Sequence, residues 1–360
     1  MVIGTCGFVG TGSSAVSDYL KEFSNTSALD MVEFIITHGP DGLEDLDFQL
    51  NEHCVKYTSS VVAIERFRGN IYNYLLRYVD DLDIRNKIIV ALEKYIKSIT
   101  QVSWKGYGAV DSQLFGSTLY RHPSFNMLSR RIGKKIHRMA SKHLHKDSRG
   151  FPLYEMNVSV QPENFDEYSR EFICDIFRAC KLDMEKTIVL DQPFNAINPG
   201  RSFKFFEDPR AIIVDRDPCD LFLLTKRYFH PLDLALCVPT NNVEQFIQYY
   251  GSMRKNMYRA IENNNDRILS IQFEDMVYRY DETRQKINSF CGLKEEDRVH
   301  HFFDPGMSIA NTQLHKRYPG EEENLEKIRQ ALPEYLYDFQ QYGEVDTSGK
   351  MFPNRSPLNK

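Results

Sequence analysis

The sequence has little that would point to a disulfide-linked, metal-binding or membrane-spanning protein. Its seven cysteines are an odd number and none of them forms a C-x-x-C pair, so neither a disulfide framework nor a zinc site is predicted. No apolar run approaches the length of a membrane span, and the chain does not open with a basic segment and an apolar core as a signal peptide does. We therefore predict a cytoplasmic protein with no bound metal.

A strong excess of either charge is also missing. The chain carries 45 Lys and Arg against 50 Asp and Glu, a net charge of −5, which argues against general binding to nucleic acid. With 360 residues, 42% of them hydrophobic, the chain is long enough for one large α/β domain or two smaller ones. Composition therefore indicates an ordinary globular protein, and function has to be inferred from local motifs.

The strongest motif lies at the N-terminus, where an apolar pair, Val2-Ile3, leads into a glycine-rich turn and then a helix. Glycines at positions 4, 7, 10 and 12 precede Ser13, and apolar side chains at 16, 19, 20 and 23 have the spacing of one buried helix face. A strand, a glycine-rich turn and a helix in this order form an anion site, because the helix start offers unpaired N–H groups and the positive end of its dipole.

Several kinds of site share these features. Gly7, Gly12, Ser13 and Ser14 have the spacing of a Walker A loop, but Ser13 stands where the phosphate-binding lysine belongs. Gly10-x-Gly12-x-x-Ala15 fits the dinucleotide-binding fingerprint. A tight turn without a ligand is a further interpretation.

A second strand is predicted at 31–37, followed by a turn at 38–42. Because parallel strands present their carboxyl ends to the ligand, Glu33 and His38 are expected near that edge of the sheet. Residues 43–150 show no regular alternation of strands and helices and are predicted to form a helical insertion or cap.

The domain organisation follows from these signals. The rest of the chain is assigned to an α/β core, residues 1–42 and 151–343, and to a polar tail, residues 344–360.

The insertion ends in a basic stretch, residues 126–146, that contains no acidic residue. Its lysines and arginines are Arg130, Arg131, Lys134, Lys135, Arg138, Lys142 and Lys146. Such a stretch is typical of a surface for an anionic partner, here a sulfated or uronic-acid glycan or phosphates, or of a solvated helix face.

A second phosphate-binding motif follows the apolar strand predicted at 211–214. Arg216 comes at the carboxyl end of this strand, and Asp217-Pro218 then starts a helix, with the aspartate as N-cap. A guanidinium group fixed beside a helix N-terminus suits a doubly charged phosphate monoester.

Taken together, these motifs resemble those of sulfotransferases that use 3′-phosphoadenosine 5′-phosphosulfate (PAPS). Residues 9–15 resemble the family's 5′-phosphosulfate loop, P-K-S-G-T-T-W, in Thr11, Gly12, Ser13 and Ser14. Residues 214–220 match its 3′-phosphate motif, V-x-R-[DN]-P-x-D. Residues 268–293 resemble its strand-E-D element with a helix ending F-x-G-L, and residues 191–194 resemble its K-D-P stretch.

The resemblance implies a P-loop-type α/β fold, with a doubly wound parallel sheet flanked by helices. It implies transfer of a sulfuryl group from PAPS, without a metal, to a hydroxyl or amine acceptor, with a carbohydrate as one candidate. The general base would be Glu33, His38 or Asp191. The residues that would bind the nucleotide are Gly10, Thr11, Gly12, Ser13, Ser14, Arg216, Thr225, Lys316 and Arg317.

Two departures from the family pattern keep other interpretations open. Gly10 stands where the family has a lysine that stabilises the leaving phosphate, and Leu224 stands where it has a serine. Candidates for the missing cation are Lys204, Lys226 and Arg227. The alternatives are a P-loop nucleotide kinase and a nucleotide-binding relative with weakened catalysis.

Overall fold

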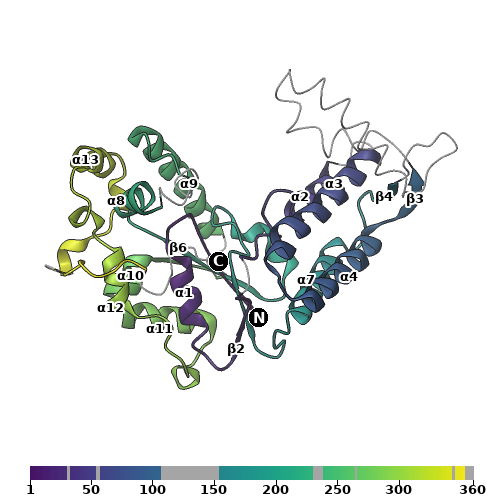
Figure 1. Cartoon of the computed structure of the whole chain (residues 1–360), viewed down its shortest axis with the longest axis horizontal. Helices are drawn as coiled ribbons and strands as arrows, with labels where there is room; N and C mark the ends of the chain where they lie inside the picture. Colours follow the sequence, from purple (N-terminus) through teal and green to yellow (C-terminus); the bar gives the residue numbers. More distant parts are fainter. Residues whose placement is uncertain are drawn as a thin grey trace. The chain divides into compact units, whose positions relative to one another are not determined.

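The structure is a computed structural model of the whole chain. It describes residues 1–30, 33–53, 57–106, 154–229, 238–263, 266–342 and 345–352. The chain divides into two compact units (Figure 1). We call them the core unit, Met1–Phe34 with Lys181–Lys360, and the insertion unit, Ile35–Cys180. The insertion unit thus begins before, and ends after, the insertion expected at 43–150.

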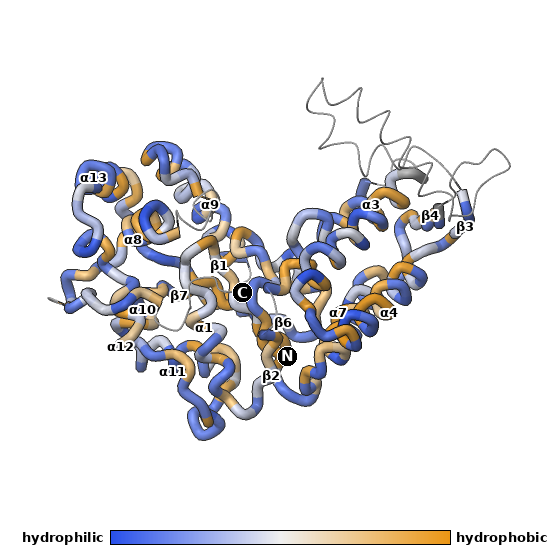
Figure 2. The backbone as a smooth tube through the Cα atoms, in the orientation of Figure 1, coloured by the Kyte–Doolittle hydropathy of each residue, from blue (hydrophilic) through white to orange (hydrophobic). Residues whose placement is uncertain are grey.

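The core unit is built on a five-stranded parallel sheet with the strand order β2-β5-β1-β6-β7. Its strands are β1 (Val2–Gly7), β2 (Thr26–Ala28), β5 (Thr187–Asp191), β6 (Pro209–Asp215) and β7 (Ile268–Gln272). The central strands β1 and β6 are almost continuously buried, as expected for parallel strands covered on both faces. Figure 2 shows strongly apolar colouring in this part of the chain. The predicted α/β fold with a parallel sheet is confirmed.

Helices of the core unit pack in two apolar clusters. The first cluster joins α1 to the sheet through Val16, Tyr19 and Leu20, which are fully buried, so the helix face predicted from the sequence is confirmed. The helices of this cluster are α1 (Ser13–Leu20), α10 (Phe273–Tyr278) and α11 (Tyr280–Cys291). The helices of the second cluster are α8 (Pro218–Leu223), α9 (Val243–Asn263) and α13 (Glu322–Ala331). The short helix α12 spans Pro305–Ser308.

The strand predicted at 31–37 is wrong for the residues that the structure describes there. The edge strand of the sheet next to β5 is β2, in which Ser27 lies opposite Ile188 of β5. Residues 35–38 instead form a turn, in which the N–H of Gly39 donates to the carbonyl oxygen of Ile35 at 2.7 Å. A short apolar run is consistent with a buried strand or with another buried segment. Here Phe34, just before the turn, and Ile36, within it, are buried without forming a strand.

In its described residues, the insertion unit is mainly helical. Its helices are α2 (Leu43–Asp47), α3 (Tyr57–Asn70), α4 (Leu82–Ile99) and α7 (Phe165–Ala179), and an antiparallel pair joins β3 (Val102–Gly106) to β4 (Tyr154–Val158). Helices α4 and α7 pack through Tyr95, whose ring stacks on Phe172 with centroids 4.9 Å apart. The basic stretch at 126–146 lies outside the described residues.

The described part of the predicted tail, residues 345–352, packs on the core unit. Met351 is buried in the cluster of α8, α9 and α13, and the ring of Phe352 lies 4.9 Å from that of Tyr228. In the part of the chain that the structure describes, no helix combines the length and the apolarity needed to cross a membrane.

Candidate active site

The glycine-rich turn between β1 and α1 is closed by one of its own side chains. The hydroxyl of Thr11 accepts a hydrogen bond from the N–H of Phe8 at 3.0 Å and donates to the Phe8 carbonyl at 2.9 Å. Thr11 is fully buried, so its side chain shapes the loop from within. The backbone N–H groups at the start of α1 remain the loop's candidate anion donors.

The two glycines of this loop are required by its geometry. Gly10 and Gly12 have φ angles of 82° and 95°, in the left-handed region that favours glycine. A Cβ atom on Gly12 would lie 2.5 Å from the ring of Phe273, and one on Gly10 would lie 3.1 Å from Leu221. A lysine at position 10 of this loop would therefore need a strained backbone and a shift of its neighbours.

Arg216 joins the second phosphate motif to this loop. Its side chain is buried, and Nη1 donates to the carbonyl oxygen of Gly10 at 3.0 Å while Nη2 donates to the carbonyl oxygen of Asn311. The guanidinium lies over the ring of Phe273, 4.9 Å from its centroid. The structure thus brings together two motifs that are about 200 residues apart in the sequence.

Gln192 spans the same loop from the opposite side. Its side-chain oxygen accepts from the N–H of Gly7 at 3.4 Å, and its Nε2 donates to the hydroxyl of Ser13 at 3.0 Å. Gln192 has a φ angle of 53°, an uncommon conformation for a non-glycine residue that is found preferentially at functional sites. The stretch at 191–194 resembles a family motif, but its sequence predicts no role for this glutamine.

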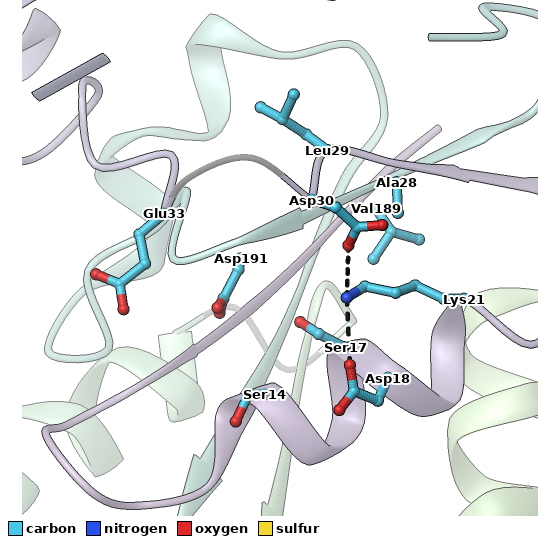
Figure 3. Close-up of a pocket in the computed structure, with 10 residues that line it drawn as sticks. All are labelled: Ser14, Ser17, Asp18, Lys21, Ala28, Leu29, Asp30, Glu33, Val189 and Asp191. Atoms are coloured by element: carbon cyan, nitrogen blue, oxygen red, sulfur yellow. Dashed lines mark hydrogen bonds and ion pairs between the residues drawn. The ribbon is translucent and has the colours of Figure 1, made fainter. Parts of the chain in front are cut away.

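Two of the three candidate bases lie beside the loop. Asp191 ends β5, is half-buried and accepts a hydrogen bond from the hydroxyl of Thr5 at 3.2 Å, whereas Glu33 is exposed. Both line a cavity of about 290 Å³ together with Ser14 of α1 (Figure 3). The third candidate, His38, belongs to the insertion unit and lies in its first turn.

Comparison with known proteins identifies the family. A model of the sulfotransferase family matches residues 113–297, which is more than half of the chain. The chain belongs to the sulfotransferase family. It is therefore a transferase, as the sequence motifs implied.

Solved structures of other sulfotransferases are similar to this sulfotransferase. The sulfotransferase domain of the olefin synthase from Synechococcus PCC 7002 has a TM-score of 0.44 and 11% identity, over 94% of this chain and 95% of that one. STF9 from Mycobacterium avium has a TM-score of 0.38 and 13% identity, over 97% and 78% of the two chains. The sulfotransferase domain from the curacin biosynthetic pathway has a TM-score of 0.39 and 13% identity, over 96% and 88%. A comparison with curated proteins finds no match.

The other residues that were predicted to bind the nucleotide form hydrogen bonds to backbone carbonyl groups of this sulfotransferase. The buried hydroxyl of Thr225 donates to the carbonyl oxygen of Leu221 at 2.9 Å. Lys316 donates to the carbonyl of Val345 at 3.3 Å, and Arg317 donates to that of Thr347 at 2.7 Å. These two basic residues therefore hold the segment 345–352 on the core unit.

The proposed replacements for the loop lysine have partners as well. Lys226 and Arg227 both form ion pairs with the buried carboxylate of Glu321, at 2.8 and 2.5 Å. Lys204 lies over the ring of Phe205, 5.3 Å from its centroid.

A buried ion pair that was not predicted from the sequence packs against Phe8 of the loop. Arg254 of α9 is fully buried, donates to Asp215 from Nη2 at 2.7 Å, and lies over the rings of Phe8 and Tyr250 at 3.9 and 3.8 Å. The hydroxyl of Tyr250 donates to the carbonyl oxygen of Arg216 at 2.7 Å. The available signal was an arginine four residues after Tyr250, on the apolar face of its helix.

Three buried carboxylates surround the turn that carries Arg216. Asp217 caps α8 as predicted and accepts from the N–H of Cys219 at 2.8 Å, while Glu274 accepts from the N–H of Asp217 at 3.1 Å. Asp220 accepts from two N–H groups of the 313–314 backbone, each at 2.7 Å. Burial, aided by repulsion from Asp220, raises the pKa of Asp217 to about 7. Burial also raises the pKa of Asp220 and Glu274, and Arg216 opposes this shift in both.

These carboxylates predict the direction of the pH dependence of stability. A carboxyl group whose pKa is raised on folding binds protons that the unfolded chain releases, so the free energy of unfolding falls as pH rises. For Asp217 the fall extends from about pH 4 to about pH 7. One oxygen of Glu274, Oε2, is buried and has no hydrogen-bond partner among the residues that the structure describes.

Glu274→Gln removes one of these charges and keeps the oxygen that accepts from Asp217. We expect the variant to be at least as stable as the wild type at pH 8 and to lose part of the fall in stability between pH 5 and 8. Urea unfolding at several pH values measures both quantities. A variant that is less stable at pH 8, with an unchanged slope, would show that Glu274 is a stabilising anion.

Proposed function

We propose that this sulfotransferase transfers a sulfuryl group from PAPS to a hydroxyl or amine acceptor. The observation that carries the proposal is the hydrogen bond from Arg216 to the carbonyl oxygen of Gly10. Through it, the motif that resembles a 5′-phosphosulfate loop adjoins the motif that resembles a 3′-phosphate site. A nucleotide with phosphate groups on both sides of its ribose needs two such sites next to each other.

In this proposal, the backbone N–H groups at Gly12, Ser13 and Ser14 bind the 5′ side of the nucleotide, where the start of α1 favours negative charge. Arg216 binds the 3′-phosphate from the neighbouring turn. Its Nε is buried and has no hydrogen-bond partner in the part of the chain that the structure describes. Thr225, Lys316 and Arg317 are proposed to act in the same subsite.

Sulfuryl transfer is an in-line displacement that depends on positioning and on stabilisation of charge. The acceptor oxygen or nitrogen forms a bond to sulfur, the bond from sulfur to the bridging phosphate oxygen breaks, and the acceptor proton passes to a base. We propose Asp191 as this base, because it is half-buried at the end of β5 beside the loop. Glu33 and His38 are the other candidates.

Gln192 is proposed to replace the donor that Gly10 cannot supply. Its amide lies across the loop, between the end of β1 and the first residue of α1. An amide N–H donor at this place would stabilise the negative charge that develops on the sulfuryl and phosphate oxygens as the bond to sulfur breaks.

A carbohydrate is the acceptor class proposed from the resemblance. The contact of an anionic glycan with the basic residues at 130–138 rests on their sequence alone, since they lie outside the described residues.

Two labelled donors separate the proposal from a nucleotide kinase. We expect transfer of ³⁵S from labelled PAPS to a panel of hydroxyl and amine acceptors in the presence of EDTA. We expect no transfer of the terminal phosphate of ATP in the presence of Mg²⁺. Phosphate transfer without sulfuryl transfer would overturn the proposal, and PAPS binding without any transfer would support the weakened relative instead.

A further inference from the structure

We infer that a groove along α1 of the core unit binds the acceptor, and that the acceptor carries a positively charged amino group. This inference rests on the proposed function and names the substrate class. It is carried by two adjoining cavities, by the charge of their walls and by an aromatic surface at the far end.

The groove consists of two cavities that share a wall. The first, of about 290 Å³, begins at Ser14 and Asp191 beside the phosphate loop. The second, of about 670 Å³, reaches His300 and Phe302. Residues that line both cavities are Asp18, Lys21, Ala28 and Asp30. The groove therefore follows α1 from its first turn to its end and has room for more than a single small group.

The walls of the groove carry an excess of negative charge. Among the described residues that line it, the carboxylates are Asp18, Asp30, Glu33 and Asp191, and the basic side chains are Lys21 and, at the far end, His300. Lys21 lies between Asp30 at 2.5 Å and Asp18 at 3.2 Å (Figure 3). Burial alone would lower the pKa of Lys21, but these two carboxylates outweigh it and raise the pKa, so Lys21 stays charged.

Glu33 has no ion pair or hydrogen bond with any residue of the described ranges, and its side chain is exposed. The single positive charge of Lys21 is shared between Asp18 and Asp30, so it compensates these two carboxylates only in part. A cleft lined mainly by one sign of charge concentrates ligands of the opposite sign. The groove consequently favours an ammonium group near the reacting end and disfavours an acceptor whose own carboxylates or sulfates would lie there.

The far end of the groove is held in place by a buried glutamate. Glu22 is fully buried, and its Oε1 accepts from the N–H groups of Phe302 at 2.6 Å and Phe303 at 2.8 Å. Its other oxygen forms an ion pair with Arg298 at 2.6 Å. The segment 298–303 is thus fixed to the end of α1.

This segment presents an aromatic surface. Phe302 is 52% exposed, and its ring stacks on that of His300 with centroids 5.2 Å apart. An exposed aromatic face beside carboxylates suits a ring with an apolar face and an ammonium substituent, because the cation is attracted both to the carboxylates and to the π-face. An amino sugar has this chemistry, so the acceptor that fits the groove is an amino sugar.

Two disaccharides with the same sugar backbone, one charged and one neutral, test the inference. The probes are β-1,4-linked glucosamine disaccharide, which carries ammonium groups, and its N-acetylated form, which is neutral. Calorimetry with the full chain at low salt is expected to show binding of the charged disaccharide at least about ten-fold tighter than the neutral one. Asp30→Asn combined with Glu33→Gln is expected to reduce this preference to less than about three-fold.

A control double variant changes the net charge equally but away from the groove. Glu323→Gln with Glu326→Gln removes two exposed carboxylates of α13 and is expected to leave the preference unchanged. Equal binding of the two disaccharides, or an equal loss in both double variants, would overturn the inference.

Binding of 3′-phosphoadenosine 5′-phosphate (PAP), measured in the same samples, separates the two proposals. Tight PAP binding with no preference between the disaccharides overturns the groove inference and supports the proposed function. A preference that the groove variant removes, with no PAP binding, supports the groove as an amino-sugar site and overturns the proposed function.

Discussion

Replacing Asp215 with asparagine is expected to destabilise the sulfotransferase by about 3–5 kcal/mol, because the change leaves the guanidinium of Arg254 buried without its counter-charge. Arg254 is fully buried and Asp215 is 1% exposed, so water cannot replace the lost carboxylate. Both carboxylate oxygens accept from Arg254, at 2.7 to 3.2 Å, and a neutral amide cannot reproduce this pairing.

Urea unfolding of the wild type and the variant measures this effect. Asp281→Asn is a matched control, since Asp281 pairs with Arg284 on the surface with its side chain 80% exposed. We expect the control to lose less than about 1 kcal/mol. Arg254→Met combined with Asp215→Asn is expected to recover much of the loss, because it removes the unpaired charge. If Asp215→Asn costs no more than Asp281→Asn, the buried pair does not support the loop.

Replacing Gln192 with alanine is expected to lower kcat for sulfuryl transfer by about 10² to 10³, the usual effect of removing one donor from developing negative charge. PAP lacks the sulfuryl group, so its affinity is expected to change by less than about three-fold. Steady-state kinetics with PAPS and calorimetry with PAP measure the two quantities separately.

Gln161→Ala is the control for this change. Gln161 is another glutamine with a left-handed backbone, at a φ angle of 45°, and it lies in the insertion unit. We expect the control to keep both kcat and PAP affinity. A parallel loss of kcat and PAP affinity in Gln192→Ala would show instead that Gln192 only maintains the shape of the loop.

The parts of the fold that were predicted correctly are those in which the local sequence pattern matches the burial seen in the structure. The strand, glycine turn and helix at 2–20 were predictable because four glycines and a helical apolar spacing occur together. Asp217-Pro218 predicted a helix start, and Asp217 caps α8 in the structure. In each case a few neighbouring residues determine the local structure.

Features that depend on distant residues were not predictable in this way. The segment 31–37 was predicted to form a strand, whereas the strand that pairs with β5 on this side is the short, partly buried β2. Arg254 and Gln192 contact the loop but are far from it in the sequence, so no local pattern predicts these contacts. Likewise, Lys316 and Arg317 hold the backbone of 345–349, which motif matching alone did not indicate.

Calorimetric titration with PAP in EDTA is the most direct measurement of whether the loop and the Arg216 turn bind one nucleotide. The account predicts metal-free binding by the wild type and about 100-fold weaker binding by Arg216→Ala, equivalent to the loss of about 3 kcal/mol from a charged donor. Failure of PAP to bind the folded wild type, or equal binding by a folded Arg216→Ala variant, would contradict it.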